Sequence, residues 1–281
     1  MHSKREAKLA EQIKALGSVL DAFGNAKTVM NANASRHGRY LELHFNDRGR
    51  ISSAKILTYG LDKTRLTRLS HEERTYHVFY QLLAGTSPQE RDHWGLEDPL
   101  DYALLASSGC YRLPSGPFSD DSIAFSELRA SLKSLVFKPK NISSMFQLLV
   151  TILLLGNLQF SEADAQDVSA FIHNIQTLDQ AARMLGVTWE GLSQTLTNKM
   201  SYVRKDLYTR LLIATIVLPA NLHLCFWTDL FHQRANMRNL TPGRRTLSRP
   251  NSTTPYLKSS PISIARTTGQ FHASGWFAEL F

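Results

Sequence analysis

The chain has 281 residues, 43% hydrophobic and 20% charged, which is enough to build one large or two modest globular cores and excludes a disordered or fibrous protein. Its net charge of +8 is concentrated at the end, because residues 213–281 hold seven Lys or Arg against two acidic residues. The rest is close to balanced, so we expect no nucleic-acid partner. Cys110 and Cys225 lie far apart without metal-ligand spacing, which favours a reducing, cytoplasmic compartment.

No stretch of the sequence is predicted to span a membrane. The first residues are charged and are not followed by a continuous apolar core, so neither a secretory signal nor an anchor is expected. The apolar run from Met145 to Leu155 covers about half of the roughly 20 residues that a bilayer needs, and it is predicted to be a buried helix. Pro219 and several polar residues interrupt the stretch from Leu211 to Trp227.

A helix followed by a β-hairpin is predicted for the first 59 residues. Apolar residues at helical spacing up to Phe23 indicate an amphipathic helix that enters a loop at Gly24. From Arg39 to Tyr59 the period changes to two, and turn-forming residues 46–49 separate two alternating runs. Because such a hairpin normally joins a larger sheet, it would leave an exposed strand edge, and we expect aggregation on overexpression.

The next segment is predicted to be a helix that begins after Leu69 and ends at Gly85. Ser70 and Glu73 have the spacing of a capping box. The core face consists of one leucine and three aromatic residues, namely Tyr76, Phe79, Tyr80 and Leu83. A long irregular region is predicted to follow, before helical spacing returns at residues 128–135.

The remaining pattern predicts further helices and then a change in character. A helix around residues 178–185 is expected to stop at Gly186, and Thr188 is expected to cap the next one. After Leu212 the sequence becomes rich in Ser, Thr, Pro and Arg, with too little apolar surface to offset the entropy of ordering. The sequence therefore predicts a folded part, residues 1–212, and a basic, disordered tail, residues 213–281.

The connection between the first helix and the hairpin concentrates groups that can bind phosphate. Residues 24–38 read GNAKTVMNANASRHG and contain three asparagine amides, hydroxyls at Thr28 and Ser35, and cations at Lys27 and Arg36. Amide and hydroxyl donors can meet a phosphate while a serine oxygen ligates Mg²⁺. The alternative is a polar loop whose side chains satisfy their own backbone.

Three blocks in order resemble the myosin motor head. Residues 20–45, LDAFGNAKTVMNANASRHGRYLELHF, are similar to the family's switch-I segment and transducer hairpin. ERTYHVFYQLLAG and LLVTILLLGNLQF are similar to two later head helices. The resemblance covers roughly Ser3 to Leu212. CYRLPSGPFSDDSIAFSELR and SYVRKDLYTRLL also resemble the myosin-like heads that are fused to fungal chitin synthases.

This resemblance implies roles for five residues of the loop. Asn31 matches the switch-I asparagine whose amide meets the nucleotide phosphates, and Ser35 matches the serine that ligates Mg²⁺. Arg36 matches the catalytic arginine that pairs with a switch-II glutamate and closes the site around the γ-phosphate. Ala34 stands where most motors place a serine, so only its backbone could contact phosphate. Asn25 matches a further loop position near the nucleotide, or else only shapes the loop.

The resemblance implies an α/β, mostly helical fragment of a P-loop NTPase-type motor domain with a transducer β-hairpin. The sequence contains neither G-x-x-x-x-G-K-[ST] nor D-x-x-G-[FY]-E, so we expect an incomplete Mg·ATP site and an inactive isolated chain. The implied partners are ATP, actin filaments and the remainder of the motor domain, in a cytoplasmic, cytoskeleton-associated parent that other segments could hold at a membrane. The alternatives are a non-enzymatic interaction module and a truncated gene product without independent activity.

Overall fold

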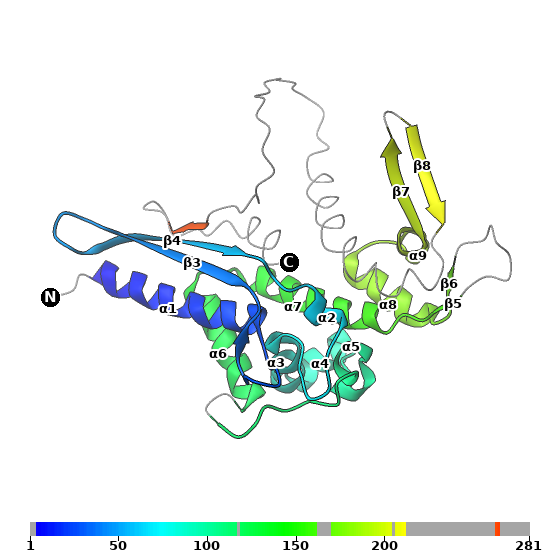
Figure 1. The fold of residues 1–281 in the computed structure, drawn as a ribbon, viewed down its shortest axis with the longest axis horizontal. Helices are drawn as coiled ribbons and strands as arrows, with labels where there is room; N and C mark the ends of the chain where they lie inside the picture. The colour runs from blue at the N-terminus through cyan, green and yellow to red at the C-terminus, as the bar shows by residue number, and fades with distance from the viewer. Residues whose placement is uncertain (1–3, 117–118, 162–169, 204–205, 212–261, 265–281) are drawn as a thin grey trace.

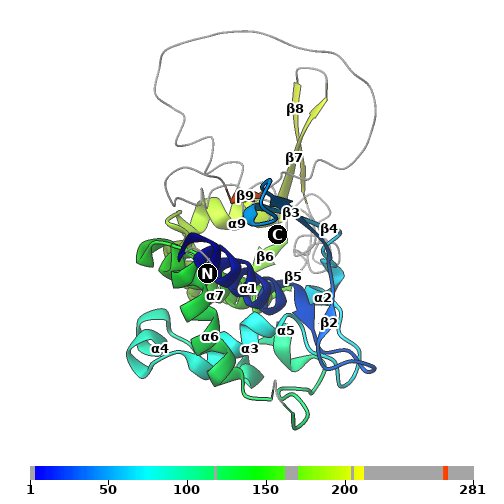
Figure 2. The ribbon, with the colours of Figure 1, turned by 90° about the vertical axis from the view of Figure 1, so that its left-hand side faces the viewer.

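In the computed structural model of this protein, the described residues are 4–116, 119–161, 170–203, 206–211 and 262–264. The first helix, α1 (Lys4–Gly24), lies between a long β-hairpin and a group of helices (Figures 1 and 2). It confirms the predicted amphipathic helix, because Leu9, Leu16 and Leu20 are buried while the charged residues between them face outward.

The hairpin consists of β3 (Gly38–Phe45) and β4 (Ile51–Tyr59), as the alternating pattern predicts. The two strands are antiparallel, with Gly38 opposite Tyr59. At the turn, the backbone N–H of Asn46 donates to the carbonyl oxygen of Arg50 at 2.9 Å, and Gly49 has a φ of +67°. On the other side of β4 lies β9 (Ile262–Ile264), so the sheet order is β3-β4-β9.

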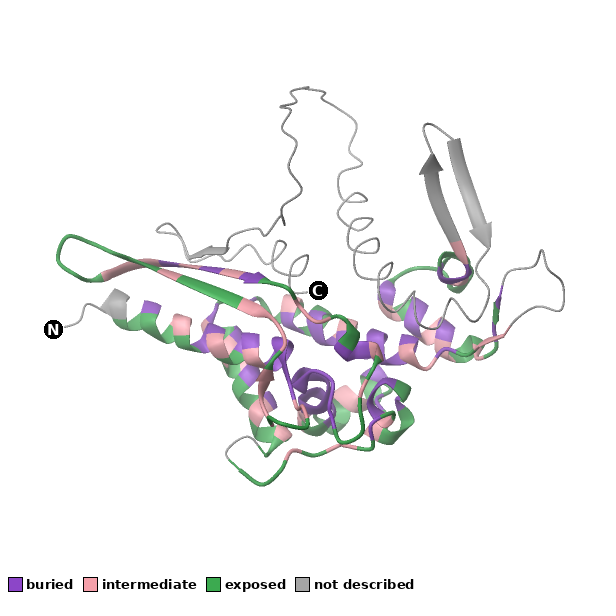
Figure 3. Ribbon diagram, viewed as in Figure 1, coloured by how far each residue is buried: buried purple, intermediate pink, exposed green. Residues whose placement is uncertain are grey.

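The hairpin rests on α1 through one strand. Ala54, Ile56 and Thr58 are buried at alternate positions of β4, and β4 contacts α1. Most of β3 is exposed (Figure 3). The hairpin therefore buries only part of one face.

The helices of the body form the core on the opposite side of α1. In chain order they are α2 (Thr64–Thr67), α3 (His77–Gly85), α4 (Pro88–Trp94), the 3-10 helix η1 (Pro99–Asp101), α5 (Ala103–Ala106), α6 (Asp121–Ser134), α7 (Pro139–Gly156), α8 (Ile175–Leu185) and α9 (Trp189–Thr197). Two small strand pairs follow in the helical body, β5 (Phe160–Ser161) with β6 (Phe171–Ile172) and β7 (Asn198–Val203) with β8 (Asp206–Leu211). α3 contacts both α1 and α6 and is buried from His77 to Leu83 (Figure 3).

Several helix boundaries confirm the sequence pattern. Gly186 ends α8 in the left-handed conformation, and the Thr188 side chain caps α9 by accepting from the backbone N–H of Gly191. The predicted buried helix at residues 145–155 lies within α7. Among the described helices, α7 is long and apolar enough to cross a bilayer, but 56% of it is buried inside the protein.

Two predictions are wrong. The helix expected after Leu69 begins only at His77, because residues 71–72 form a turn and residues 74–76 bond to the loop that follows α1. The region after Gly85 is not wholly irregular, since it contains α4, η1 and α5. Its overlooked signal is a capping box at the start of α4, in which Ser87 and Glu90 bond each other's backbone. Of the predicted tail, only residues 262–264 are described.

A buried arginine joins α6 to the segment before α3. Arg74 is 0% exposed, its Nη2 donates to the Asp121 carboxylate at 2.9 Å, and its guanidinium lies 3.8 Å from the ring centre of Tyr80. Asp121 starts α6, whose N-cap is Asp120. Burial raises the pKa of Asp121, and the bond from Arg74 opposes that rise without cancelling it.

The end of α6 carries a strained residue. Val136 has a φ of +64°, where a β-branched side chain is crowded. The backbone N–H groups of Val136 and Phe137 donate to the carbonyl oxygens of Lys133 and Leu132, respectively, which is the pattern of a Schellman motif. In this motif Val136 occupies the position where helices usually have glycine.

We expect Val136→Gly to raise the free energy of unfolding by roughly 1 kcal/mol, because glycine adopts a positive φ without the cost that an L side chain carries. Urea denaturation of the 281-residue chain would measure the change. Val136→Ala is the matched control, since it keeps the Cβ atom and should recover little of this gain. A lower free energy of unfolding for the glycine variant would contradict the strain.

Candidate functional site

The loop after α1 is itself a narrow hairpin. β1 (Asn25–Ala26) pairs antiparallel with β2 (Ala34–Ser35), which places Asn25 opposite Ser35 and Ala26 opposite Ala34. Two further bonds close its base, because the N–H of Arg36 donates to the Gly24 carbonyl at 2.8 Å and the His37 Nδ1 lies 3.2 Å from the same oxygen. The His37 ring lies where a Cβ on Gly24 would be, so a larger residue here would displace that ring.

A turn closes the far end of the loop. The N–H of Thr28 donates to the Asn31 carbonyl at 2.9 Å, and the N–H of Asn31 donates to the Thr28 hydroxyl at 3.1 Å. The Asn31 side-chain oxygen accepts from the N–H of Asn33 at 2.9 Å. The turn therefore has the self-satisfied bonding that the polar-loop alternative requires, while Asn31 stays exposed to solvent.

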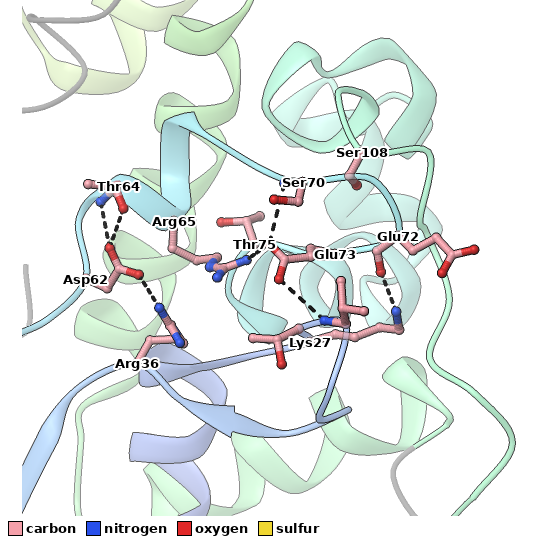
Figure 4. Close-up of polar contacts among 12 residues, drawn as sticks. Lys27, Arg36, Asp62, Thr64, Arg65, Ser70, Glu72, Glu73, Thr75 and Ser108 are labelled. Atoms are coloured by element: carbon pink, nitrogen blue, oxygen red, sulfur yellow. Dashed lines mark hydrogen bonds and ion pairs between the residues drawn. The ribbon is translucent and has the colours of Figure 1, made fainter.

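The loop is bonded to the segment before α3 (Figure 4). The N–H of Arg74 donates to the Lys27 carbonyl at 3.0 Å, and Ala26 forms a β-bridge with Tyr76. The Lys27 ammonium donates to the Glu72 carbonyl. These contacts fix one side of the loop, and the two that join backbone groups explain why residues 74–76 are not helical.

Glu73 anchors the same side through its carboxylate. It accepts from the buried guanidinium of Arg65 and, at 3.4 Å, from the N–H groups of Val29 and Ser70 (Figure 4). Burial raises the pKa of Glu73, but the bond and the charge of Arg65, together with the two N–H donors, lower it below its usual value. The buried ion pair of Glu73 with Arg65 therefore holds the loop in place at Val29.

Asn33 holds the inner side of the loop. Its side-chain oxygen accepts from the Asn25 amide at 3.0 Å and contacts the His77 Nε2 at 3.1 Å. His77 is the first residue of α3 and is buried. The three side chains thus connect both strands of the loop to a core helix.

The environment keeps His77 neutral. Burial, and then the charge of Arg74, lowers the pKa of His77 to about 4. Because the Asn33 oxygen can only accept, Nε2 carries the proton, and Nδ1 is buried with no partner among the described residues. The neutral imidazole is therefore a structural donor at physiological pH.

Arg36 has a partner within the chain. Its Nη2 lies 2.7 Å from the Asp62 carboxylate, and the N–H of Asp62 donates to the Arg36 carbonyl at 2.8 Å (Figure 4). The other carboxylate oxygen of Asp62 accepts from the N–H and hydroxyl of Thr64. Burial raises the pKa of Asp62, but the bonds from Thr64 and Arg36 and the nearby positive charges lower it below its usual range.

The structure separates the residues that the sequence singled out. Ser35 on β2 and Asn31 in the turn are exposed, whereas Arg36 and Ala34 are half-buried. Asn25 is only 3% exposed and its amide bonds to Asn33. Among the described residues, no group of three His, Cys, Asp or Glu is placed to hold a metal.

Sequence reasoning missed Asn33, His77 and Asp62. Asn33 lies in the same loop, but its inward direction is set by the short pairing of β1 with β2, which covers only two residues of each strand. Asp62 follows the hairpin, and the antiparallel return of β4 brings it next to Arg36. That return was predictable from the hairpin; the contact at His77 depends on tertiary packing.

Comparison with known proteins identifies the family of this chain. Residues 1–221 match the myosin head (motor domain) family. Chitin synthase 8 of Mycosarcoma maydis is 35% identical over 213 residues, which cover 75% of this chain and 10% of the relative. Chitin synthase 5 of Cryptococcus neoformans var. grubii is 37% identical over 210 residues, 74% of this chain and 11% of the relative.

Plant myosins are related as well. Myosin-1 of Arabidopsis thaliana is 32% identical over 237 residues, which cover 82% of this chain and 20% of the relative. The chain thus spans between about a tenth and a fifth of the length of these three relatives. Since the family match extends over 221 of the 281 residues, the chain belongs to the myosin head (motor domain) family.

Proposed function

We propose that residues 24–38 are the switch-I element of a myosin motor and form one wall of an Mg·ATP site. The observation that carries this proposal is the fixed loop, which bonds to α3 and the preceding segment while Asn31 and Ser35 stay exposed. The Asn31 amide would donate to a phosphate oxygen, and the Ser35 hydroxyl would ligate Mg²⁺. Asn25 is buried, so it would shape the loop and would act on a nucleotide only indirectly, through the shape of the loop.

The fit to Mg²⁺ is partial. Ser35 offers one neutral oxygen, and Mg²⁺ needs an octahedral set of oxygens that usually includes waters, carboxylates and substrate phosphates. These residues would therefore hold the ion only together with a phosphate. Bound Mg²⁺ would neutralise phosphate charge. Ala34 presents a methyl group, so its contribution to a phosphate would come from its backbone.

Arg36 would act by changing partners. The family resemblance assigns it a switch-II glutamate, and in this chain the Asp62 carboxylate lies 2.7 Å from its Nη2. Its Nε is buried without a partner among the described residues, so at least one further N–H would be available to a second carboxylate or a phosphate. We assign Asp62 the role of holding Arg36 when neither group is present.

The proposal also covers the hairpin and the division of the chain into two parts. β3 and β4 would form the transducer hairpin, residues 1–212 would be part of a motor unit, and residues 213–281 a separate basic tail. The rest of the motor domain, ATP and actin filaments would be the partners, in a cytoplasmic, cytoskeleton-associated parent. The chitin synthases among the relatives favour a parent with such an enzyme attached, and other segments would hold it at a membrane.

A second candidate is a non-enzymatic interaction module derived from a motor head. Ala34 favours it, because a hydroxyl is missing where most motors relay a proton, and so does the Asp62 partner of Arg36. Actin co-sedimentation of the 281-residue chain with and without Mg·ATP separates the two. A motor fragment should lose actin on adding nucleotide, whereas an interaction module should stay bound at the same level.

Titration of the 281-residue chain with Mg·ATP tests the switch-I assignment. We expect weak binding, with a Kd of about 1 mM or higher, because one wall supplies few charge-assisted contacts. Amide NMR shifts should be confined to residues 27–36. Ser35→Ala should remove the Mg²⁺ dependence of these shifts, and Ser193→Ala on α9 is the matched control. Shifts elsewhere, or none at all, would contradict the assignment.

The Arg36–Asp62 pair gives a separate expectation. Asp62→Asn keeps an oxygen for Thr64 but removes the charge that holds Arg36, so affinity for pyrophosphate should rise about tenfold. Arg36→Met in the same background should abolish that gain. An unchanged affinity in Asp62→Asn, measured by calorimetry, would show that Arg36 does not face the anion.

His77 makes the loop anchor sensitive to acid. The pKa of His77 is lowered to about 4 in the folded chain, from an ordinary value of about 6.5. The imidazole therefore binds a proton more tightly in the unfolded chain than in the folded chain. The contribution of neutral His77 to the free energy of unfolding is complete above the ordinary pKa and is lost as the pH falls toward 4. We expect wild type to lose about 2 kcal/mol more than His77→Gln between pH 7 and pH 5.

His77→Gln is suited to this comparison because its amide can still donate to Asn33 and it does not titrate. Urea denaturation at both pH values gives the two free energies of unfolding. Equal losses in wild type and variant would mean that His77 is not held neutral.

A further inference from the structure

The short strands β5 and β6 pair at the end of the protein that lies away from the turn of the β3–β4 hairpin (Figure 1). Their register joins two residue pairs, and Ser161 lies opposite Phe171 in the outer pair. The base is held by a further bond, because the N–H of His173 donates to the Gln159 carbonyl at 3.0 Å. Ser161 is partly exposed in extended backbone, and a pairing of two residues opens at little cost.

A histidine that follows β6 faces the Ser161 hydroxyl. The Nε2 of His173 forms a hydrogen bond with this hydroxyl. The His173 ring is exposed and packs edge-to-face on the ring of Phe171, with 4.7 Å between the ring centres. Stacking and the hydrogen bond therefore direct the imidazole toward Ser161. When it is protonated, its Nε2 can donate to an anion at this position.

Acidic residues follow Ser161 in the sequence. The next six residues read EADAQD, so carboxylates stand one, three and six positions after the serine. Enzymes that modify proteins choose substrates partly by charge complementarity, and basic groups beside the active site of a kinase can bind acidic residues at such positions. A serine with this pattern, in an extended and partly exposed segment, fits a protein kinase that recognises acidic residues after its target.

We propose that Ser161 is a phosphorylation site for a protein kinase of this acidic specificity, and that His173 binds the phosphate. The Ser161 oxygen attacks the γ-phosphorus of ATP, the bond from that phosphorus to the β-phosphate oxygen breaks, ADP leaves, and the hydroxyl proton passes to the catalytic base of the kinase. The phosphate carries a charge of about −1.5 to −2 at pH 7, so it favours the protonated imidazole and links β5 to β6 by a charge-assisted hydrogen bond. Modification of Ser161 does not require nucleotide binding by this chain, so it can hold or fail separately from the proposed function.

Other serines of the chain share part of this sequence pattern. Four have an acidic residue three positions later, namely Ser3, Ser18, Ser70 and Ser87. Ser18 lies within α1, so it cannot become extended without unwinding that helix. Ser3 lies outside the described residues. The structural comparison with Ser161 therefore concerns Ser70 and Ser87.

At both of these serines the acidic residue is already engaged within the folded chain. The carboxylate after Ser70 belongs to Glu73, which is buried in an ion pair. The carboxylate after Ser87 belongs to Glu90, and its two oxygens accept from the two Nη atoms of Arg129, each at 2.9 Å. A kinase that binds acidic residues would have to break these pairs first. The sequence pattern and the structure together favour Ser161.

Incubation of the 281-residue chain with an acid-directed serine kinase and Mg·ATP tests the site, with the modified residue located by mass spectrometry. We expect a phosphate on Ser161. Glu162→Gln combined with Asp164→Asn should slow this modification by at least about tenfold, because the carboxylates that the kinase binds are gone. Ser126→Ala, at an exposed position on α6, is the matched control and should leave the rate at Ser161 unchanged. No phosphate on Ser161, or a rate that the charge variant leaves unchanged, would overturn the proposal.

Phosphorus NMR of the phosphorylated chain tests the role of His173 without a change at the serine. The second ionisation of a serine phosphate has a pKa of about 6, and a protonated imidazole beside it favours the dianion. The phosphate should therefore titrate at a lower pH in wild type than in His173→Gln, whose amide carries no charge. His71→Gln, in the exposed turn before α3, is the matched control and should titrate like wild type. Equal titration in wild type and His173→Gln would overturn the binding of the phosphate by His173.

Discussion

The hydrogen bond from the N–H of Arg74 to the carbonyl of Lys27, 3.0 Å long, fixes the loop after α1 to the helical body of this protein. It adds to the packing of α1 on α3 and α6, which already holds the start of the loop against that body. Arg74 is itself fixed by Asp121 and the ring of Tyr80 in the buried interior. The position of the loop therefore depends on a core residue and does not rest on the loop's own turn alone.

This constraint explains the chemistry of the loop. Its inner groups face the protein, since the Asn25 amide donates to Asn33 and Asn33 contacts His77 of α3, whereas its outer groups, Asn31 and Ser35, are exposed to solvent. Arg36 is intermediate, because Asp62 holds one of its nitrogens while another is buried without a described partner. A loop that is fixed before a ligand arrives loses less conformational freedom on binding. The anchors therefore favour a loop that presents its outer groups in one arrangement.

The sequence predicts much of the fold, because periodicity and turn chemistry are local. α1, the hairpin, α7 and the Gly186 and Thr188 boundaries follow from such patterns. The start of α3 does not, because the spacing of Ser70 and Glu73 favours a helix that the pairing with Lys27 overrides. For the site, the loop and its family could be identified from its residues. The contact of His77 with Asn33 could not, since it joins residues 44 positions apart through tertiary packing; the place of Asp62 next to Arg36, 26 positions away, follows from the antiparallel return of the hairpin.

Hydrogen exchange at the Arg74 amide tests most directly whether the loop is fixed without a ligand. In the 281-residue chain free of nucleotide, this N–H should exchange as slowly as the amides within α3, because the Lys27 carbonyl accepts it beside a buried side chain. Exchange as fast as in the exposed turn at residues 46–49 would contradict the account. In that case the loop would separate from the core, and its exposed and buried groups would not be fixed in advance.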